Sequence, residues 1–138
     1  MDKDLLSHSL SLVDLPDDGL TVRFYDILFE RYPAVQPMFT RGTRLQASML
    51  RTAVIAVVDH LDDPEWLTST LGAMGRRHAA LGVTEPMYGA VAECMIAAMS
   101  EIGGQDWSPE MTDAWTEALT AVASLMLAGY PEEEEGAA

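Results

Sequence analysis

The sequence predicts a single all-helical domain. Glycine and proline interrupt the chain at intervals, and no run of about four to eight residues alternates apolar and polar side chains as a half-buried strand does. Between these breaks, apolar residues recur three and four positions apart, which places them on one side of a helix. The chain has 138 residues, 49% of them hydrophobic, which is enough for one buried core.

Charge and composition exclude several classes of function. Eight basic and 22 acidic residues give a net charge of −14, which repels phosphate backbones and anionic lipid, so we expect neither nucleic acid nor membrane partners. No apolar run reaches the roughly 18 residues of a membrane helix and no leader opens the chain, so we expect a cytoplasmic protein. The single cysteine, Cys94, cannot form an internal disulfide, and its neighbours favour a place in the core.

The first half of the chain is expected to form three helices. The first covers 4–13, and the second begins after Asp17 and Asp18, whose side chains could cap it. The second ends near Tyr32, because Pro33 disfavours a helical residue before it. The third has the clearest apolar face, formed by Leu45, Met49, Leu50, Ala53, Val54, Val57, Val58 and Leu61.

Three further helices are expected in the second half. One begins at Pro64 and is closed by Gly82, and the next begins at Thr84 and is broken by Gly103. Ser108 is suited to cap the last. Their stripes are Leu67, Leu71, Met74, His78 and Leu81; Tyr88, Val91, Met95, Met99 and Ile102; and Met111, Trp115, Leu119, Val122 and Met126. We expect one domain over 1–131 and an acidic, disordered tail over 132–138.

Two polar residues, His78 and Gln46, occupy positions on these apolar stripes. Burying either side chain costs on the order of 1–3 kcal/mol unless it finds a partner. For His78, spacing alone allows two interpretations: a core histidine bonded to a carbonyl, or an iron ligand in an apolar pocket. His8 and His60 are both expected to be solvated. The chain shows no glycine-rich phosphate loop, nucleophile turn or zinc-binding histidine pair.

The order of motifs resembles a globin, specifically the single-domain bacterial haemoglobins and the globin domain of flavohaemoglobins. The matching segments are 24–33, 37–39, 61–65, 76–83 and 114–115, together with Gln46 and Tyr88. They span residues 20–130. Each segment is weakly specific, but together, in this order and spacing, they form a strong signal. The resemblance implies the globin fold with haem b as cofactor.

The resemblance also assigns residues to the two faces of the haem. His78 matches the iron's protein ligand, and Phe39 matches the aromatic residue packed against the haem. On the distal face, Tyr25 and Gln46 would donate hydrogen bonds to a bound gas, and Leu50 would be the apolar residue over the iron. Neither donor competes as an axial ligand, so we expect a five-coordinate ferrous iron that is open to dioxygen, nitric oxide or carbon monoxide.

On the proximal side the sequence departs from the family. Tyr88 matches a supporting tyrosine, and Val83 lies in the matching segment as a further haem contact. The family's glutamate on the last helix is replaced by Tyr130, and a neighbouring tyrosine position holds Leu119. The carboxylate that would orient the ligand is thus missing, and Tyr88 or a backbone carbonyl is expected to orient His78 instead. Arg77 is either a haem-propionate partner or a surface arginine.

The sequence leaves four hypotheses for the function. The leading hypothesis is reversible dioxygen binding for storage, delivery or buffering. The second is nitric oxide dioxygenase activity, which would need a separate reductase because the sequence has no flavin or nicotinamide signature. The third is a haem-based gas or redox sensor, and the fourth is a helical module without haem.

Overall fold

The computed structural model describes residues 1–131, and these residues confirm the all-helical prediction, with no strand in that range. Helices α1 to α6 account for most of the chain, and short 3₁₀ segments η1 to η3 join them. The α-helices are α1 (Lys3–Val13), α2 (Gly19–Arg31), α3 (Thr43–Asp59), α4 (Pro64–Ala80), α5 (Glu85–Gly103) and α6 (Pro109–Ala128). The 3₁₀ segments are η1 (Pro16–Asp18), η2 (Pro33–Met38) and η3 (Gly104–Asp106). The expected acidic tail over 132–138 lies outside the described residues.

Local side chains explain most of the helix starts. Asp63 accepts a hydrogen bond from the backbone N–H of Trp66 at the start of α4, and Ser108 accepts one from Met111 at the start of α6. The expected caps before α2 are wrong. Asp17 and Asp18 adopt the left-handed conformation, with φ of 59° and 58°, and the side chain of Asp18 makes no capping bond.

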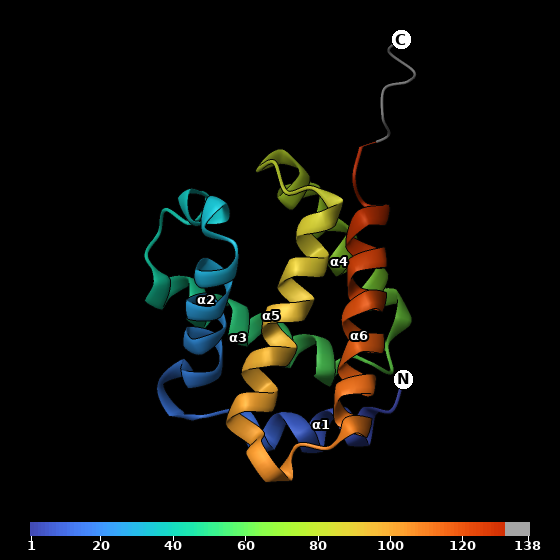
Figure 1. Cartoon of the computed structure of the whole chain (residues 1–138). Helices are drawn as coiled ribbons and strands as arrows, with labels where there is room; N and C mark the ends of the chain where they lie inside the picture. The colour runs from blue at the N-terminus through green and yellow to red at the C-terminus, as the bar shows by residue number, and fades with distance from the viewer. Residues whose placement is uncertain (132–138) are drawn as a thin grey trace.

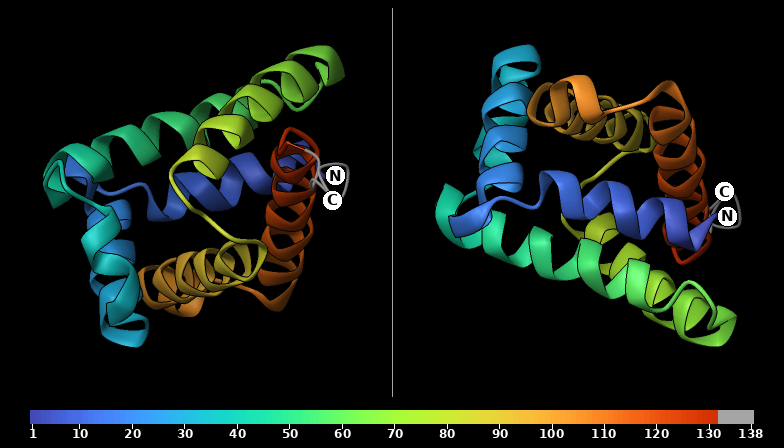
Figure 2. Two further views of the ribbon diagram at one scale, coloured as in Figure 1. Left: turned by 90° about the horizontal axis from the view of Figure 1, so that it is seen from above. Right: turned by 90° about the horizontal axis from the view of Figure 1, so that it is seen from below.

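Helices α2 to α6 form a frame, and α1 lies across one end of it (Figures 1 and 2). In Figure 1, α2, α5 and α6 stand upright from left to right, while α1 crosses beneath them. The two views of Figure 2 show α2, α5, α6 and the α3–α4 pair as the sides of this frame. The main contacts join α2 to α5 and α3, and α4 to α6. Helices α3 and α4 are therefore held by different neighbours.

The apolar core is divided into two clusters. The larger lies between α1, α2, α3, α5 and α6, and it includes Phe24, Tyr25 and Met99. The smaller lies between α4 and α6 and is built on Leu67, Leu71 and Met126. As expected, Cys94 is buried in the larger cluster. The division matters because Tyr25, Phe39 and Leu50 belong to the larger cluster, whereas Tyr88 belongs to the smaller one.

Glycines bring the backbones of α4 and α6 into direct contact. A Cβ atom added at Gly75 would overlap the carbonyl group of Met126, and one added at Gly129 would overlap the carbonyl group of Gly72. A side chain at either position would push the helices apart. The two glycines therefore allow α6 to approach the middle of α4 within backbone contact.

Three apolar residues predicted on inward stripes lie exposed. Leu45 and Met49 on α3 keep 50% and 45% of their accessible surface, and Leu81 keeps 72%. Leu81 is exposed because α4 ends at Ala80, so the residue lies beyond the helical stripe. Leu45 and Met49 lie in the first two turns of α3, on a side that no other helix within residues 1–131 covers. No helix within residues 1–131 is long and apolar enough to cross a membrane.

Replacing Gly75 with alanine should lower the free energy of unfolding by about 1–3 kcal/mol, the usual cost of overpacking, because the new methyl group meets the Met126 carbonyl. The matched control is Gly72→Ala on the same helix, where an added Cβ meets no atom within 4 Å. That change should be neutral or stabilising by up to about 1 kcal/mol. Urea unfolding followed by circular dichroism measures both, and equal effects would contradict the close contact.

Candidate functional site

His78 lies in the last turn of α4, half-buried, with one ring nitrogen already in use. Its Nδ1 atom lies 2.8 Å from the carbonyl oxygen of Met74, one turn earlier in the helix. A carbonyl can only accept a hydrogen bond, so Nδ1 must carry the proton in this contact. In the neutral ring the proton is thereby fixed on Nδ1, and Nε2 keeps its lone pair free to bind a metal.

The backbone of His78 is held by the turn that closes α4. The N–H of Val83 donates to the carbonyl of His78 at 3.0 Å, and the N–H of Gly82 donates to the carbonyl of Ala79 at 3.0 Å. Gly82 has φ of +89°, which a side chain disfavours. This pair of bonds is the Schellman arrangement, and it confirms Gly82 as the residue that ends the helix.

A pair of tyrosines adjoins this turn. The hydroxyl of Tyr130 donates to the carbonyl of Val83 at 2.9 Å and lies 2.9 Å from the hydroxyl of Tyr88. Burial raises the pKa of the Tyr88 phenol, and the hydrogen bond to Tyr130 raises it further by a smaller amount. The Tyr88 ring lies 6.4 Å from the His78 ring, centroid to centroid. Of the two groups expected to orient His78, the backbone carbonyl of Met74 makes the bond.

Tyr25, on α2, is the most buried of the distal candidates. Its ring packs against Phe39 and Phe29, with centroids 5.3 Å and 5.7 Å away, and 5% of its surface is exposed. Its hydroxyl makes no hydrogen bond with residues 1–131, and no fully buried side-chain oxygen in that range lacks a partner. The hydroxyl therefore opens onto accessible space. Burial raises the pKa of the phenol to about 12, so at neutral pH it is protonated and can donate.

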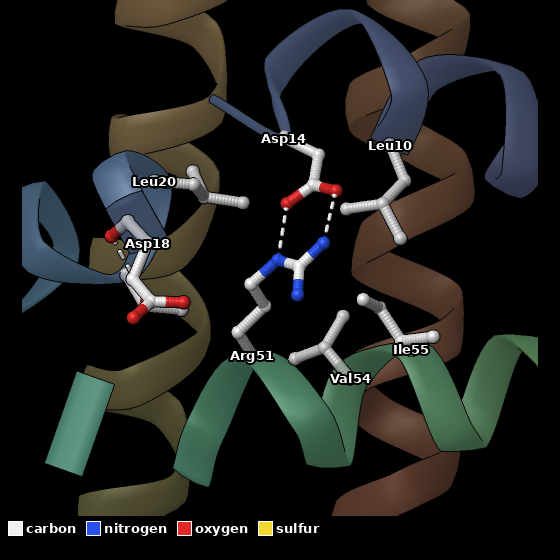
Figure 3. Close-up of a pocket in the computed structure, with 8 residues that line it drawn as sticks. Leu10, Asp14, Asp18, Leu20, Arg51, Val54 and Ile55 are labelled. Atoms are coloured by element: carbon white, nitrogen blue, oxygen red, sulfur yellow. Dashed lines mark hydrogen bonds and ion pairs between the residues drawn. The ribbon is translucent and has the colours of Figure 1, made fainter. Parts of the chain in front are cut away.

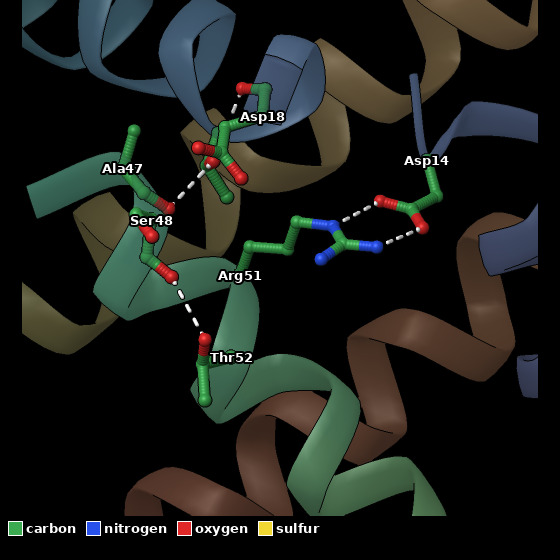
Figure 4. Close-up of polar contacts among 7 residues, drawn as sticks. Asp14, Asp18, Ala47, Ser48, Arg51 and Thr52 are labelled. Atoms are coloured by element: carbon green, nitrogen blue, oxygen red, sulfur yellow. Dashed lines mark hydrogen bonds and ion pairs between the residues drawn. The ribbon is translucent and has the colours of Figure 1, made fainter. Parts of the chain in front are cut away.

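A hydrogen bond joins α2 to α3 beside Gln46. The hydroxyl of Thr21, one turn before Tyr25, donates to the carbonyl of Ala47 at 2.8 Å. Figure 4 shows this bond at Ala47 on α3. Gln46 directly precedes Ala47 and is half-buried. Its side chain forms no hydrogen bond with the described part of the chain, so its amide is free for a ligand.

An ion pair fixes α3 one turn further along. Arg51, directly after Leu50, donates from Nε and Nη2 to the two carboxylate oxygens of Asp14 at 2.8 Å and 2.9 Å. These hydrogen bonds hold the pKa of the Asp14 carboxyl below its ordinary value. Figures 3 and 4 show the pair facing Asp18 at the junction of α1, α2 and α3. The cavity beside it holds only about 10 Å³, so the pair anchors α3 and encloses no ligand site.

The remaining candidates differ in burial. Phe39, Leu50, Val83 and Tyr88 are half-buried, while Arg77 is exposed, which fits either of its expected roles. His8 is exposed as predicted, but the prediction that His60 is solvated is wrong. Its ring is half-buried and stacked on Trp66, with centroids 3.8 Å apart, and its Nδ1 atom lies 2.7 Å from the carbonyl oxygen of Ala56.

Sequence reasoning identified Tyr130 only as a departure from a pattern and assigned it no partner. Its two hydrogen-bond partners lie 42 and 47 residues away along the chain. The sequence signal that could have pointed to it is Gly129, a small residue that lets the end of α6 approach α4.

Comparison with known proteins identifies the family. The family model for globins matches residues 22–126. This chain belongs to the globin family. It is 27% identical to a flavohemoprotein of Pseudomonas putida over 95% of this chain and 36% of that protein. The chain therefore spans about a third of the length of that relative.

Solved structures agree with this assignment. An engineered carbene transferase, built on a candidate nitric oxide dioxygenase of Rhodothermus marinus, superposes with a TM-score of 0.78 at 28% identity, covering 90% of this globin and 87% of that chain. A bacterial globin of Campylobacter jejuni also superposes with a TM-score of 0.78, at 23% identity over 92% of each chain. The similarity to the Campylobacter jejuni globin shows that the two chains share a fold.

Membership of the globin family implies a haem cofactor, and the residues of this globin fit one. His78 has the ligating nitrogen free and the other nitrogen fixed. Tyr25 and Phe39 belong to the larger apolar cluster, whereas Met74 and Tyr88 belong to the smaller one, so each set of candidates has apolar neighbours of its own. Within residues 1–131 no group of three or more metal-binding side chains occurs, and haem iron needs only one protein ligand because the porphyrin supplies four.

The pKa of the buried Tyr25 phenol should be about 12, above that of an exposed tyrosine, because burial disfavours the phenolate. In the unfolded chain the phenol ionises near pH 10. Above that pH the unfolded state binds fewer protons than the folded state, so stability falls between about pH 10 and 12. Carbon-13 NMR of labelled tyrosines measures the titration, and Tyr25→Phe should remove the resonance that shifts near pH 12. Its survival would contradict the assignment.

Proposed function

We propose that this globin binds haem b through His78 and takes up dioxygen and other diatomic gases reversibly, for storage or delivery in the cytoplasm. The observation that supports this proposal is the hydrogen bond between His78 Nδ1 and the Met74 carbonyl, which leaves Nε2 free to bind iron. Met74 and Tyr88, which lie beside His78, belong to the smaller apolar cluster. When bound, the haem would supply the iron that binds the gas. Every other task falls to side chains of the protein.

The distal side chains supply hydrogen-bond donors and exclude water. Tyr25 offers a protonated hydroxyl and Gln46 a free amide, and a donor gains strength where the surroundings are apolar and dry. Phe39 and Leu50 supply those apolar surroundings, together with Phe29 beside Tyr25. Because two hydrogen-bond donors would hold the bound gas, we expect the protein to release it slowly. Val83 and Tyr88 would line the proximal side, and Arg77 would pair with a haem propionate.

A neutral acceptor behind His78 favours reversible binding over oxidative chemistry. A carboxylate that accepts the Nδ1 proton raises the basicity of a ligating histidine. Here that proton is donated to the carbonyl of Met74, and burial raises the pKa of the nearby Tyr88 phenol, which keeps it uncharged at neutral pH. The imidazole therefore donates less electron density than one bonded to a carboxylate.

Nitric oxide dioxygenase activity is a second candidate, favoured by the similarity to flavohemoproteins and to the Rhodothermus marinus protein. In this reaction nitric oxide and dioxygen combine with one electron to give nitrate. The electron for this reaction would come from a reductase. With a generic flavin reductase supplying electrons, carrier function predicts one stoichiometric loss of nitric oxide. Sustained turnover, followed with a nitric oxide electrode, would favour the enzyme instead.

Replacing His78 with alanine should abolish the five-coordinate ferrous spectrum after reconstitution with haem, because the ring nitrogen for the iron is lost. Added imidazole should restore part of it. The matched control is His60→Ala. His60 makes the same bond to a carbonyl one turn earlier, but its ring stacks on Trp66. Absorption spectra in the oxidised, reduced and gas-bound states report the result. A wild-type protein without a Soret band would contradict the proposed function.

A further inference from the structure

Helix α3 carries two of the distal candidates, Gln46 and Leu50, but few buried contacts hold it. It packs mainly on α2, with smaller contacts to α1 and η1. Of its 17 residues, only Ala47 and Val58 are buried. A helix with so few buried side chains can shift or open at a low free-energy cost. The polar bonds that tie α3 to its neighbours therefore matter for where the two candidates lie.

Arg51 supplies the main polar bond in the middle of this helix. Between Ala47 and Val58 it is the one α3 side chain that donates a hydrogen bond to a residue outside the helix, among residues 1–131. Its guanidinium meets the Asp14 carboxylate through two parallel bonds of 2.8 Å and 2.9 Å (Figure 3). Asp14 keeps 25% of its side-chain surface, the least of the acidic partners in the four ion pairs of the described range. A paired bond of this kind fixes orientation as well as distance.

The ion pair lies next to the distal candidates on the surface of the helix. Ala47 and Arg51 are four residues apart and form one row along α3, while Gln46 and Leu50 form the adjacent row. Because successive residues turn by about 100° around a helix axis, any rotation or slide of α3 moves both rows together. The Ala47 carbonyl is bonded to Thr21 on α2, and Arg51 is bonded to the end of α1. Two attachments one turn apart fix the rotation of the helix.

The segment that holds Asp14 is itself firmly placed. Val13, directly before it, is fully buried at the end of α1. In the middle of α1, the buried hydroxyl of Ser9 accepts a hydrogen bond of 2.8 Å from the indole N–H of Trp115 on α6. Helix α1 therefore packs on α6 and α5 more than on α3. The ion pair ties a lightly held helix to a part of the fold that does not depend on it.

We propose that Asp14 and Arg51 are positioning residues for the distal side of the candidate site. Their ion pair holds α3 against the end of α1, and α3 in turn holds Gln46 and Leu50 in place for a bound gas. Neither charged group contacts the gas, so both act through the helix. The proposal rests on the proposed function, in which Gln46 and Leu50 face the gas.

Asp14→Asn and Arg51→Gln each remove one charge of the pair. In the haem-loaded ferrous protein with carbon monoxide, we expect the C–O stretching band in infrared spectra to broaden and to rise in frequency. A hydrogen bond to the bound gas lowers that frequency, and a displaced Gln46 amide would donate less. Dioxygen should dissociate about threefold to tenfold faster, the effect of weakening one hydrogen bond. Because both changes break the same pair, the double variant should match either single one.

Two further readouts separate positioning from general loosening. The iron–histidine stretching band in resonance Raman spectra of the ferrous protein should stay unchanged, because His78 lies on α4, which is held by α6. Hydrogen exchange at the backbone amides of α3 should accelerate in both variants, while exchange in α4 should not. The exchange measurement needs no gas ligand.

The matched control is Arg23→Gln. Arg23 makes the same paired bond, from Nε and Nη2 to the carboxylate of Glu101 at 2.7 Å and 3.0 Å, but it joins α2 to α5. Those two helices share one of the most extensive contacts in the fold, so its loss should leave the C–O band and α3 exchange unchanged. Asp14→Glu keeps a carboxylate for Arg51 and should retain most of the slow dioxygen release.

An unchanged C–O band and unchanged α3 exchange in both Asp14→Asn and Arg51→Gln would overturn the proposal. An equal shift in Arg23→Gln, or an equal change in the iron–histidine band, would also overturn it, since the pair would then contribute only to overall stability. Absence of haem binding by the wild-type protein would instead contradict the proposed function. The two failures are distinguishable, because α3 exchange reports on the ion pair without haem.

Discussion

The backbone contact between α4 and α6 determines where the candidate iron ligand lies. Gly75 and Gly129 allow the two helices to touch carbonyl to Cα, which no larger residue permits. Helix α4 packs chiefly on α6, whereas α3 packs on α2. The contact between α4 and α6 therefore sets the position of His78 relative to the other helices. The smaller apolar cluster, built on Leu71 and Met126, closes around the same crossing.

The opposite wall of the site is held by different forces. There α3 is attached to α2 by the bond from Thr21 to Ala47 and to α1 by the ion pair between Arg51 and Asp14. Gln46 and Leu50 each directly precede one of these anchored residues on α3. The distal candidates on α3, Gln46 and Leu50, thus lie beside polar contacts to neighbouring helices, whereas His78 lies on a helix that is held by close packing.

Much of the fold could be predicted from the sequence because its signals are local. Prolines, glycines and capping side chains such as Ser108 act within a few residues, so every expected α-helix is present within a few residues of its predicted ends. The same reasoning failed at Asp18, where the helix starts from a left-handed residue. It also failed at Leu45, because an apolar stripe shows which residues share a face but not whether another helix covers it.

The sequence by itself determined the helices and the family resemblance, since both rest on residue order and spacing, and the resemblance made His78 the candidate ligand. Only the tertiary structure decided what surrounds that ligand. The carbonyl of Met74 rather than a side chain accepts its Nδ1 proton, and Tyr130 bonds to residues 42 and 47 positions away. The two partners of Tyr130 are absent from any local pattern, because the packing of α6 against α4 and α5 brings them together.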